Sequence, residues 1–129
     1  MTMDDSLYFT EQHHQVREMV RGFATSEVAP VAAKFDAIGE FPWEKVRKMG
    51  EVGLLGVPWP EELGGAGLDY ISYMTVIHEM AKVDASHAIT ISAHTTVGPS
   101  PIVNFGTREQ KARYVPLLAS GRVLGGFGL

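Results

Sequence analysis

The side chains of this sequence that are best suited to bind a metal ion or transfer a proton are its five histidines, His13, His14, His78, His87 and His94. The first two are adjacent, so on a helix their side chains diverge by about 100° and cannot bind one ion together. The third begins the H-E-x-x-H zinc pattern, but Lys82 stands where its last ligand belongs. The last two are seven residues apart, which is too far for a shared ion without a third group. The spacing therefore predicts surface or ordinarily hydrogen-bonded histidines and no metal site.

A glycine-rich run and a pair of acids are the next groups with chemical potential. Gly64-Gly65-Ala66-Gly67 precedes a predicted helix, and a helix N-terminus attracts anions. The run lacks the G-x-G-x-x-G spacing and the lysine of a P-loop, and Asp69 already brings a negative charge to the helix start. Glu61 and Glu62 are neighbours in a loop and are expected to be solvated. No Ser/His/Asp or Cys/His arrangement is readable, so the spacing indicates no catalytic centre in the chain.

A stripe of apolar residues on one predicted helix has two interpretations. Ile89, Ala93 and Val97 stand at i, i+4 and i+8, which places them on one helix face. Such a stripe is most often packed into a core. The surrounding residues are small or hydroxylic, which would instead let something thin lie along the helix: Ser92, Thr95, Thr96 and Gly98. The residues by themselves leave both interpretations open.

The N-terminal third of the chain predicts two helical segments. Thr10 is a good N-cap, and the buried stripe of the first segment is Val16, Met19, Val20, Phe23 and Ala24. Pro30 kinks or restarts this helix, whose apolar pattern resumes at Val31, Phe35 and Ile38 and whose stop signal is Gly39. Pro42 suits the first position of the next segment, which is expected to bury Trp43, Val46 and Met49 and to end near Gly53.

The rest of the chain predicts further helices joined by short links. Asp69 caps a helix whose inward residues are Tyr73, Val76, Ile77, Met80 and Ala81. Ser86 is expected to cap the helix that runs to about Val97, and a short helical turn covers 101–105. Thr107 opens an S/T-x-x-E/Q capping box, so a helix starts there and should end near Val115, before Pro116.

The last seven residues, 123–129, read as the opening of a β-strand, and a lone strand is not stable in water. We therefore expect an all-α, orthogonal-type bundle of five to six helices over residues 1–122, which leads into the first strand of a β-domain that these residues do not include. The strand belongs either to a longer protein, which we favour, or to a sheet in another chain.

Composition excludes several classes of protein. An apolar fraction of 45% and a charged fraction of 20% are those of a soluble globule. The net charge of −4 argues against nucleic acid as a partner, and no window approaches the roughly 20 apolar residues of a membrane span. There is no cysteine and no basic-then-apolar signal layout at the N-terminus. These features predict a cytoplasmic protein without disulfides or thiolate metal sites.

Several segments, taken together and in this order, resemble one family. They are Gly39-Glu40-Phe41-Pro42, the run from Pro60 to Leu68, the run from Glu79 to Ser86, Ser92-Ala93-His94-Thr95-Thr96, the run from Phe105 to Lys111, and Leu118-Ala119-Ser120-Gly121. In order and spacing, from about Leu7 onward, they resemble the N-terminal helical domain of acyl-CoA dehydrogenases. The run 92–96 is most similar to the short-chain and branched-chain members.

The resemblance implies an FAD-dependent α,β-desaturation of an acyl-CoA thioester by the complete protein. It implies that Phe127, Gly128 and Leu129 lie against the flavin, and that Ile89, Ala93 and Val97 line the acyl-chain end of the substrate slot. It also implies reoxidation by an electron-transferring flavoprotein that docks near Leu68, and a homo-tetramer. The family's catalytic glutamate would lie beyond Leu129, so no residue here is assigned as catalytic base and the isolated chain is expected to be inactive.

Two alternatives to a domain of a larger dehydrogenase remain open. One is a stand-alone helical interaction module of the same ancestry that has lost the chemistry. The other is complementation, in which a second chain brings the missing domains.

Overall fold

The computed structural model describes residues 7–128, and all regular elements in that range are helical, which confirms the all-α prediction. The elements are α1 (Glu11–Phe23), the π-helical turn η2 (Ala24–Val28), α2 (Ala29–Ile38), α3 (Trp43–Glu51), the 3₁₀ turn η3 (Glu61–Leu63), α4 (Tyr70–Ala81), α5 (Ala85–Val97), α6 (Pro99–Phe105) and α7 (Arg108–Ala119). Because α1, η2 and α2 are continuous and α5 meets α6 at Gly98, the described residues form five helical rods. None of these helices has the length and apolarity needed to cross a bilayer.

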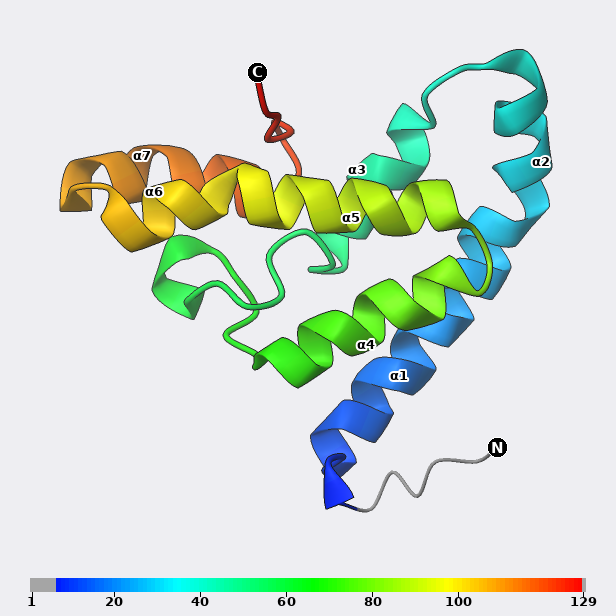
Figure 1. Cartoon of the computed structure of the whole chain (residues 1–129), viewed down its shortest axis with the longest axis horizontal. Coiled ribbons are helices and arrows are strands. Elements are labelled where there is room, and N and C mark those ends of the chain that lie inside the picture. Colours follow the sequence, from blue (N-terminus) through cyan, green and yellow to red (C-terminus); the bar gives the residue numbers. More distant parts are fainter. Residues whose placement is uncertain (1–6, 129) are drawn as a thin grey trace.

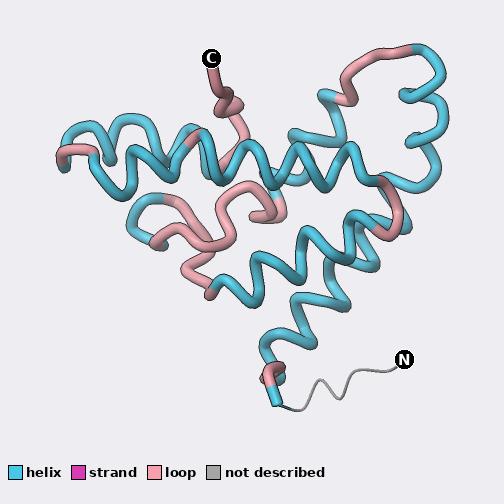
Figure 2. The backbone as a smooth tube through the Cα atoms, viewed as in Figure 1, coloured by secondary structure: helices cyan, strands magenta, loops and turns pink. Residues whose placement is uncertain are grey.

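The rods pack in a chain of neighbours (Figure 1). α1 lies beside α4, α4 beside α5, and α6 and α7 form a hairpin at the end of the molecule opposite α2. The long loop between α3 and α4 fills the space beneath α5 and α7 (Figure 2). Their shared core consists mainly of Val16, Val20, Ala24, Val28, Val46, Met49, Leu54, Leu55, Val57, Tyr73, Val76, Met80, Ala88 and Ile91.

The first rod begins where the sequence predicts. Thr10 is the N-cap of α1, and its backbone N–H donates to His13 Nδ1 at 2.9 Å, so the histidine closes the capping box. Met19, expected in the core, is 44% exposed, because the inward face is narrower than the predicted stripe. Pro30 is the second residue of α2, directly after the π turn, which accommodates the missing proline N–H. The helix thus restarts at this proline, as predicted, without leaving the rod.

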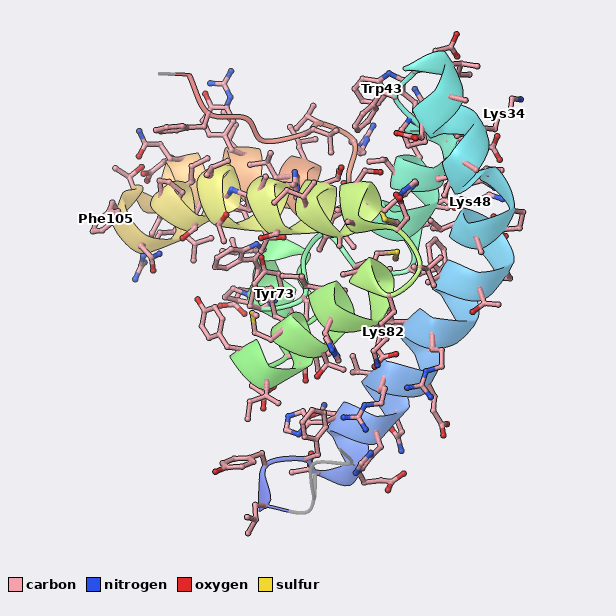
Figure 3. The ribbon with its side chains drawn as sticks, turned by 45° about the vertical axis from the view of Figure 1, so that its right-hand side comes forward. Lys34, Trp43, Lys48, Tyr73, Lys82 and Phe105 are labelled. Carbon is pink, nitrogen blue, oxygen red and sulfur yellow. The ribbon has the colours of Figure 1, made fainter. Side chains whose placement is uncertain are left out.

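The burial predicted for Trp43 is wrong. Its side chain is 55% exposed and packs edge-on against Phe41, with ring centroids 4.7 Å apart (Figure 3). Trp43 is the first residue of α3, and the inward face of that helix begins one turn later at Val46, which is buried together with Met49. An apolar residue in the first turn therefore follows the helix pattern without reaching the core.

Aspartates cap the two central helices. Asp69 accepts hydrogen bonds from the Ser72 N–H at 2.8 Å and from His13 Nε2 at 2.8 Å, and these two bonds lower the pKa of Asp69 to about 2. Since His13 Nδ1 is already an acceptor, the proton of this ring is on Nε2. The predicted cap at Ser86 is wrong, because Asp84 accepts from the His87 N–H at 3.0 Å and α5 starts at Ala85.

The last helix is longer than predicted. The capping box of Thr107 with Gln110 is present, but α7 continues through Pro116 to Ala119. A proline inside a helix costs about 3 kcal/mol or more. Burial of Leu118 and Ala119 compensates for this cost, and Ala119 packs so closely on the α3–α4 loop that a Cβ at Gly56 would meet its Cβ at 2.9 Å.

Candidate functional site

The stripe on α5 faces away from the core. Ile89 is 62% exposed, Ala93 is exposed and Val97 is half-buried, whereas the opposite face of the helix is buried through His87, Ala88, Ile91, His94 and Thr95. The core-packing interpretation is therefore wrong for the described structure. The hydroxyls of Thr90 and Thr96 are satisfied within the helix, where they donate to the Ser86 and Ser92 carbonyls at 2.8 and 2.7 Å, so they do not compete for the outward face.

The segment that follows α7 forms no strand within the described residues, and its place as the first strand of a β-domain stays a prediction. After the turn at Ser120–Gly121, residues 123–128 form irregular chain that contacts the end of α5 at Gly125 and then points away from that helix (Figure 1); Leu129 lies outside the described residues. A strand is defined by pairing with a neighbour, and no strand is present in residues 7–128 to pair with. Instead the Val123 N–H donates to the Leu117 carbonyl at 3.2 Å.

The structure joins two predicted site groups that are far apart in sequence. Gly125 crosses the α5–α6 junction, where a Cβ built on it would lie 2.3 Å from Gly98 Cα. This contact puts the 123–128 segment next to Val97, the last residue of the stripe. Ile89 lies eight residues earlier, about 12 Å along the helix, so the stripe leads away from the segment.

His94 is a residue of this site that sequence reasoning missed. It is 2% exposed, and its Nε2 donates to the Leu118 carbonyl at 2.9 Å while its Nδ1 accepts from the Gly125 N–H at 3.0 Å. Burial lowers the pKa of His94 from its usual 6.5, although the bond to Leu118 opposes this shift. The only signal in the sequence is a histidine on the apolar side of a helix.

The glycine run is structural and offers no phosphate cradle. Its backbone N–H groups all donate within the loop, for example Gly65 to the Pro60 carbonyl at 3.0 Å and Gly67 to the Trp59 carbonyl at 2.8 Å. Gly64 and Gly67 have φ of 83° and 63°, in the left-handed region that favours glycine. With these donors used, the run has nothing left to bind an anion.

The buried carboxylate of the domain is Glu79, and its surroundings suit stability rather than proton transfer. It accepts from Arg21 of α1 at 3.0 Å, across the α1–α4 contact, and from Lys82 at the end of its own helix (labelled in Figure 3) at 2.7 Å. Burial raises the pKa of Glu79, but these two cations outweigh burial and leave the pKa below its usual 4.5. In residues 7–128 no three His, Cys, Asp or Glu side chains lie close enough together to hold a metal ion.

A second apolar surface lies on α4. A shallow groove of about 510 Å³ is lined by Phe9, Tyr70, Ile71, Met74, Thr75 and His78. Met74 is 57% and Ile71 40% exposed. Leu68, which the sequence singled out, is instead half-buried and packs against the core.

Comparisons with known proteins agree with this geometry. An acyl-CoA dehydrogenase of Bacillus subtilis is 46% identical over 95% of this chain, and the short-chain specific acyl-CoA dehydrogenase of Clostridium acetobutylicum is 44% identical over 93%. This chain spans 32% of the length of each of these relatives. The solved structure of acyl-CoA dehydrogenase from Bacillus anthracis complexed with FAD matches with a TM-score of 0.85 at 37% identity, covering 92% of this chain and 21% of that chain.

The family model for the acyl-CoA dehydrogenase N-terminal domain matches residues 10–122, which are most of the chain and hold every helix from α1 to α7. This chain therefore belongs to the acyl-CoA dehydrogenase family, of which it contains the N-terminal helical domain.

Proposed function

We propose that this chain serves as the N-terminal domain of an FAD-dependent enzyme that desaturates short- or branched-chain acyl-CoA thioesters between Cα and Cβ. The observation that carries the proposal is the exposed apolar stripe of α5, which ends beside the 123–128 segment. In this proposal residues 1–122 form the domain and 123–129 lead into a β-domain. The complete enzyme is a cytoplasmic homo-tetramer, and the isolated chain is inactive because it holds no catalytic base.

Residues 126–128 fit a flat, hydrogen-bonding cofactor such as FAD. A Cβ at Gly126 or Gly128 would meet no atom within 4 Å, Phe127 is 70% exposed, and in the described residues the backbone groups of this stretch make no hydrogen bond. They are free to bind the edge of a ring, and we assign Phe127, Gly128 and Leu129 to this role. FAD bound there supplies the acceptor for the hydride that leaves the substrate.

The stripe of α5 would form one wall of the acyl-chain slot. Ile89, Ala93 and Val97 present apolar surface that excludes water and aligns the chain, and positioning of this kind lowers a barrier by several kcal/mol. Alanine at the centre leaves the most room. The side chain at position 93 therefore limits the chain length that the slot accepts.

Ala93→Phe in the full-length enzyme is expected to shift preference toward shorter acyl chains, because the ring fills the middle of the slot. We expect kcat/KM for the longer of two substrates to fall about tenfold relative to the shorter one. Steady-state kinetics over a series of acyl-CoA chain lengths measures this. Ala112→Phe, at an exposed alanine of α7, is the matched control and should leave the profile unchanged. An unaltered chain-length preference in Ala93→Phe would contradict the assignment.

We also propose that the groove on α4 docks the electron-transferring flavoprotein, with acyl-CoA and this flavoprotein as the two partners of the enzyme. Because Leu68 packs against the core, its substitution would mix docking with stability. Met74→Glu is the cleaner test, since its side chain is largely exposed. We expect reoxidation by the partner to slow about tenfold while dye-coupled turnover is retained. Phe105→Glu, at an 88% exposed site on the far hairpin, is the control, and equal losses in both assays of Met74→Glu would refute the placement.

A further inference from the structure

One side chain of α5 forms a hydrogen bond with the 123–128 segment, which also packs against the core through Leu124. His94 Nδ1 accepts from the Gly125 N–H at 3.0 Å, and the other hydrogen bond of the described segment is made at its start, where Val123 donates to the Leu117 carbonyl. The same imidazole donates from Nε2 to the Leu118 carbonyl at 2.9 Å, at the end of α7. The buried ring thus joins three parts of the chain: α5, the end of α7 and the segment that leaves it.

The backbone of the 123–128 segment contacts α5 at Gly98, and this contact limits where the segment can cross the helix. A Cβ at Gly98 would lie 2.6 Å from the His94 carbonyl oxygen and 2.8 Å from Gly125 Cα. The two glycines therefore allow the segment to approach α5 closely enough for the imidazole to reach the Gly125 N–H. One residue further on, at Gly126, the space is open.

We propose that His94 is a positioning residue, whose bond to the Gly125 N–H sets the place of Phe127 and Gly128 relative to the Val97 end of the α5 stripe. The inference rests on the proposed function, because it makes this bond responsible for the position of the residues that would face the flavin. His94 touches neither substrate nor cofactor and acts only through the backbone at Gly125. The role requires an acceptor at Nδ1 and is separate from the Nε2 bond that secures α7.

Two substitutions separate these two bonds. The amide of asparagine lies at the position of Nδ1, so His94→Asn can still accept from Gly125 and loses the bond to Leu118. The amide of glutamine lies near Nε2, so His94→Gln keeps the bond to Leu118 and loses the acceptor for Gly125. Each variant removes one hydrogen bond, and thermal stability should fall by a similar amount in both.

The experiment compares both variants with wild type in the full-length, flavin-loaded enzyme. We expect His94→Gln to raise hydrogen–deuterium exchange of peptides spanning 123–128, to alter the visible flavin spectrum and to lower kcat/KM about tenfold. His94→Asn should keep wild-type exchange and spectrum. Wild-type exchange in His94→Gln, or equal changes in the two variants, would overturn the positioning role.

A substitution at Gly125 tests the position of the segment without changing the imidazole. Gly125→Ala places a Cβ against Gly98 and should reproduce the spectrum and exchange of His94→Gln, whereas Gly22→Ala, in open space on α1, should keep the wild-type spectrum and exchange of this segment. Identical behaviour of these two alanine variants would contradict the inference. Failure of wild-type enzyme to bind FAD would refute the proposed function and the positioning role together, while the exchange data would still report whether His94 holds the segment.

Discussion

Gly65→Ala is expected to destabilise the domain by about 3 kcal/mol, because the added methyl group overlaps fixed backbone atoms. A Cβ at this position would lie 2.0 Å from the Trp59 carbonyl oxygen and 2.4 Å from its carbonyl carbon. The surrounding loop is held by hydrogen bonds from Ala66 to Gly56 and from Leu68 to Val57, so it cannot yield locally. Urea unfolding followed by circular dichroism measures the change.

Gly22→Ala is the matched control for this substitution. Gly22 lies inside α1, and a Cβ there would meet no atom within 4 Å. Alanine in an exposed helix interior is favoured over glycine by about 0.5–1 kcal/mol, so this variant should be slightly more stable than wild type. If Gly65→Ala also unfolds at wild-type urea concentrations, the packing of the glycine loop on Trp59 is wrong.

Glu79→Gln is expected to cost about 2–3 kcal/mol at neutral pH, which lowers the melting temperature by about 10 °C. The Glu79 side chain is 2% exposed, links α4 to α1 through Arg21, and also binds Lys82 at the end of its own helix. Glutamine fills the same volume but cannot satisfy both cations with a charged acceptor. About half of each cation remains in water, which limits the loss to less than that of a fully buried pair. Thermal unfolding monitored by circular dichroism tests this.

The sign of the pH dependence distinguishes charge from shape. Because the pKa of Glu79 in the folded state is below its usual 4.5, its contribution is complete above that value and is lost as the pH falls through the lowered folded-state pKa. The difference between Glu79→Gln and wild type should therefore shrink as the pH falls from about 7 to about 3. Glu62→Gln, at an exposed carboxylate, should show no difference at either pH. A Glu79→Gln deficit that stays constant across this range would indicate lost packing instead of lost charge.

Local sequence signals predicted the helices well where a short stretch of chain decides the outcome. Thr10, Asp69 and Thr107 each form a capping hydrogen bond with the residue three positions later in the chain. The three helix starts predicted from these residues agree with the structure. The predicted cap Ser86 and the observed cap Asp84 lie two residues apart, and only the geometry showed that the Asp84 carboxylate reaches the His87 N–H. Boundaries that depend on local hydrogen bonding are thus readable to within a turn.

Errors arose where packing against distant residues decides. A proline normally ends a helix, yet burial of Leu118 and Ala119 carries α7 past Pro116. Periodicity predicted that Trp43 and Met19 are buried, but both are exposed. The width of the buried face of a helix depends on the elements that pack against it. The stripe of α5 also shows that apolar periodicity does not by itself predict burial, since this periodic apolar run proved to be exposed.

The sequence by itself determined the all-α class, the main helix starts and, through its combination of segments, the family. The class and the helix starts follow from hydrogen bonds and side-chain spacing within a few residues of each other, whereas the family follows from the resemblance of the combined segments. Only the tertiary structure decided that the stripe faces outward, that the glycine run has no free donors, and that His94 binds the 123–128 segment beside Val97. Those outcomes depend on contacts between residues far apart in the chain, whose formation is governed by burial and shape complementarity that no local pattern encodes.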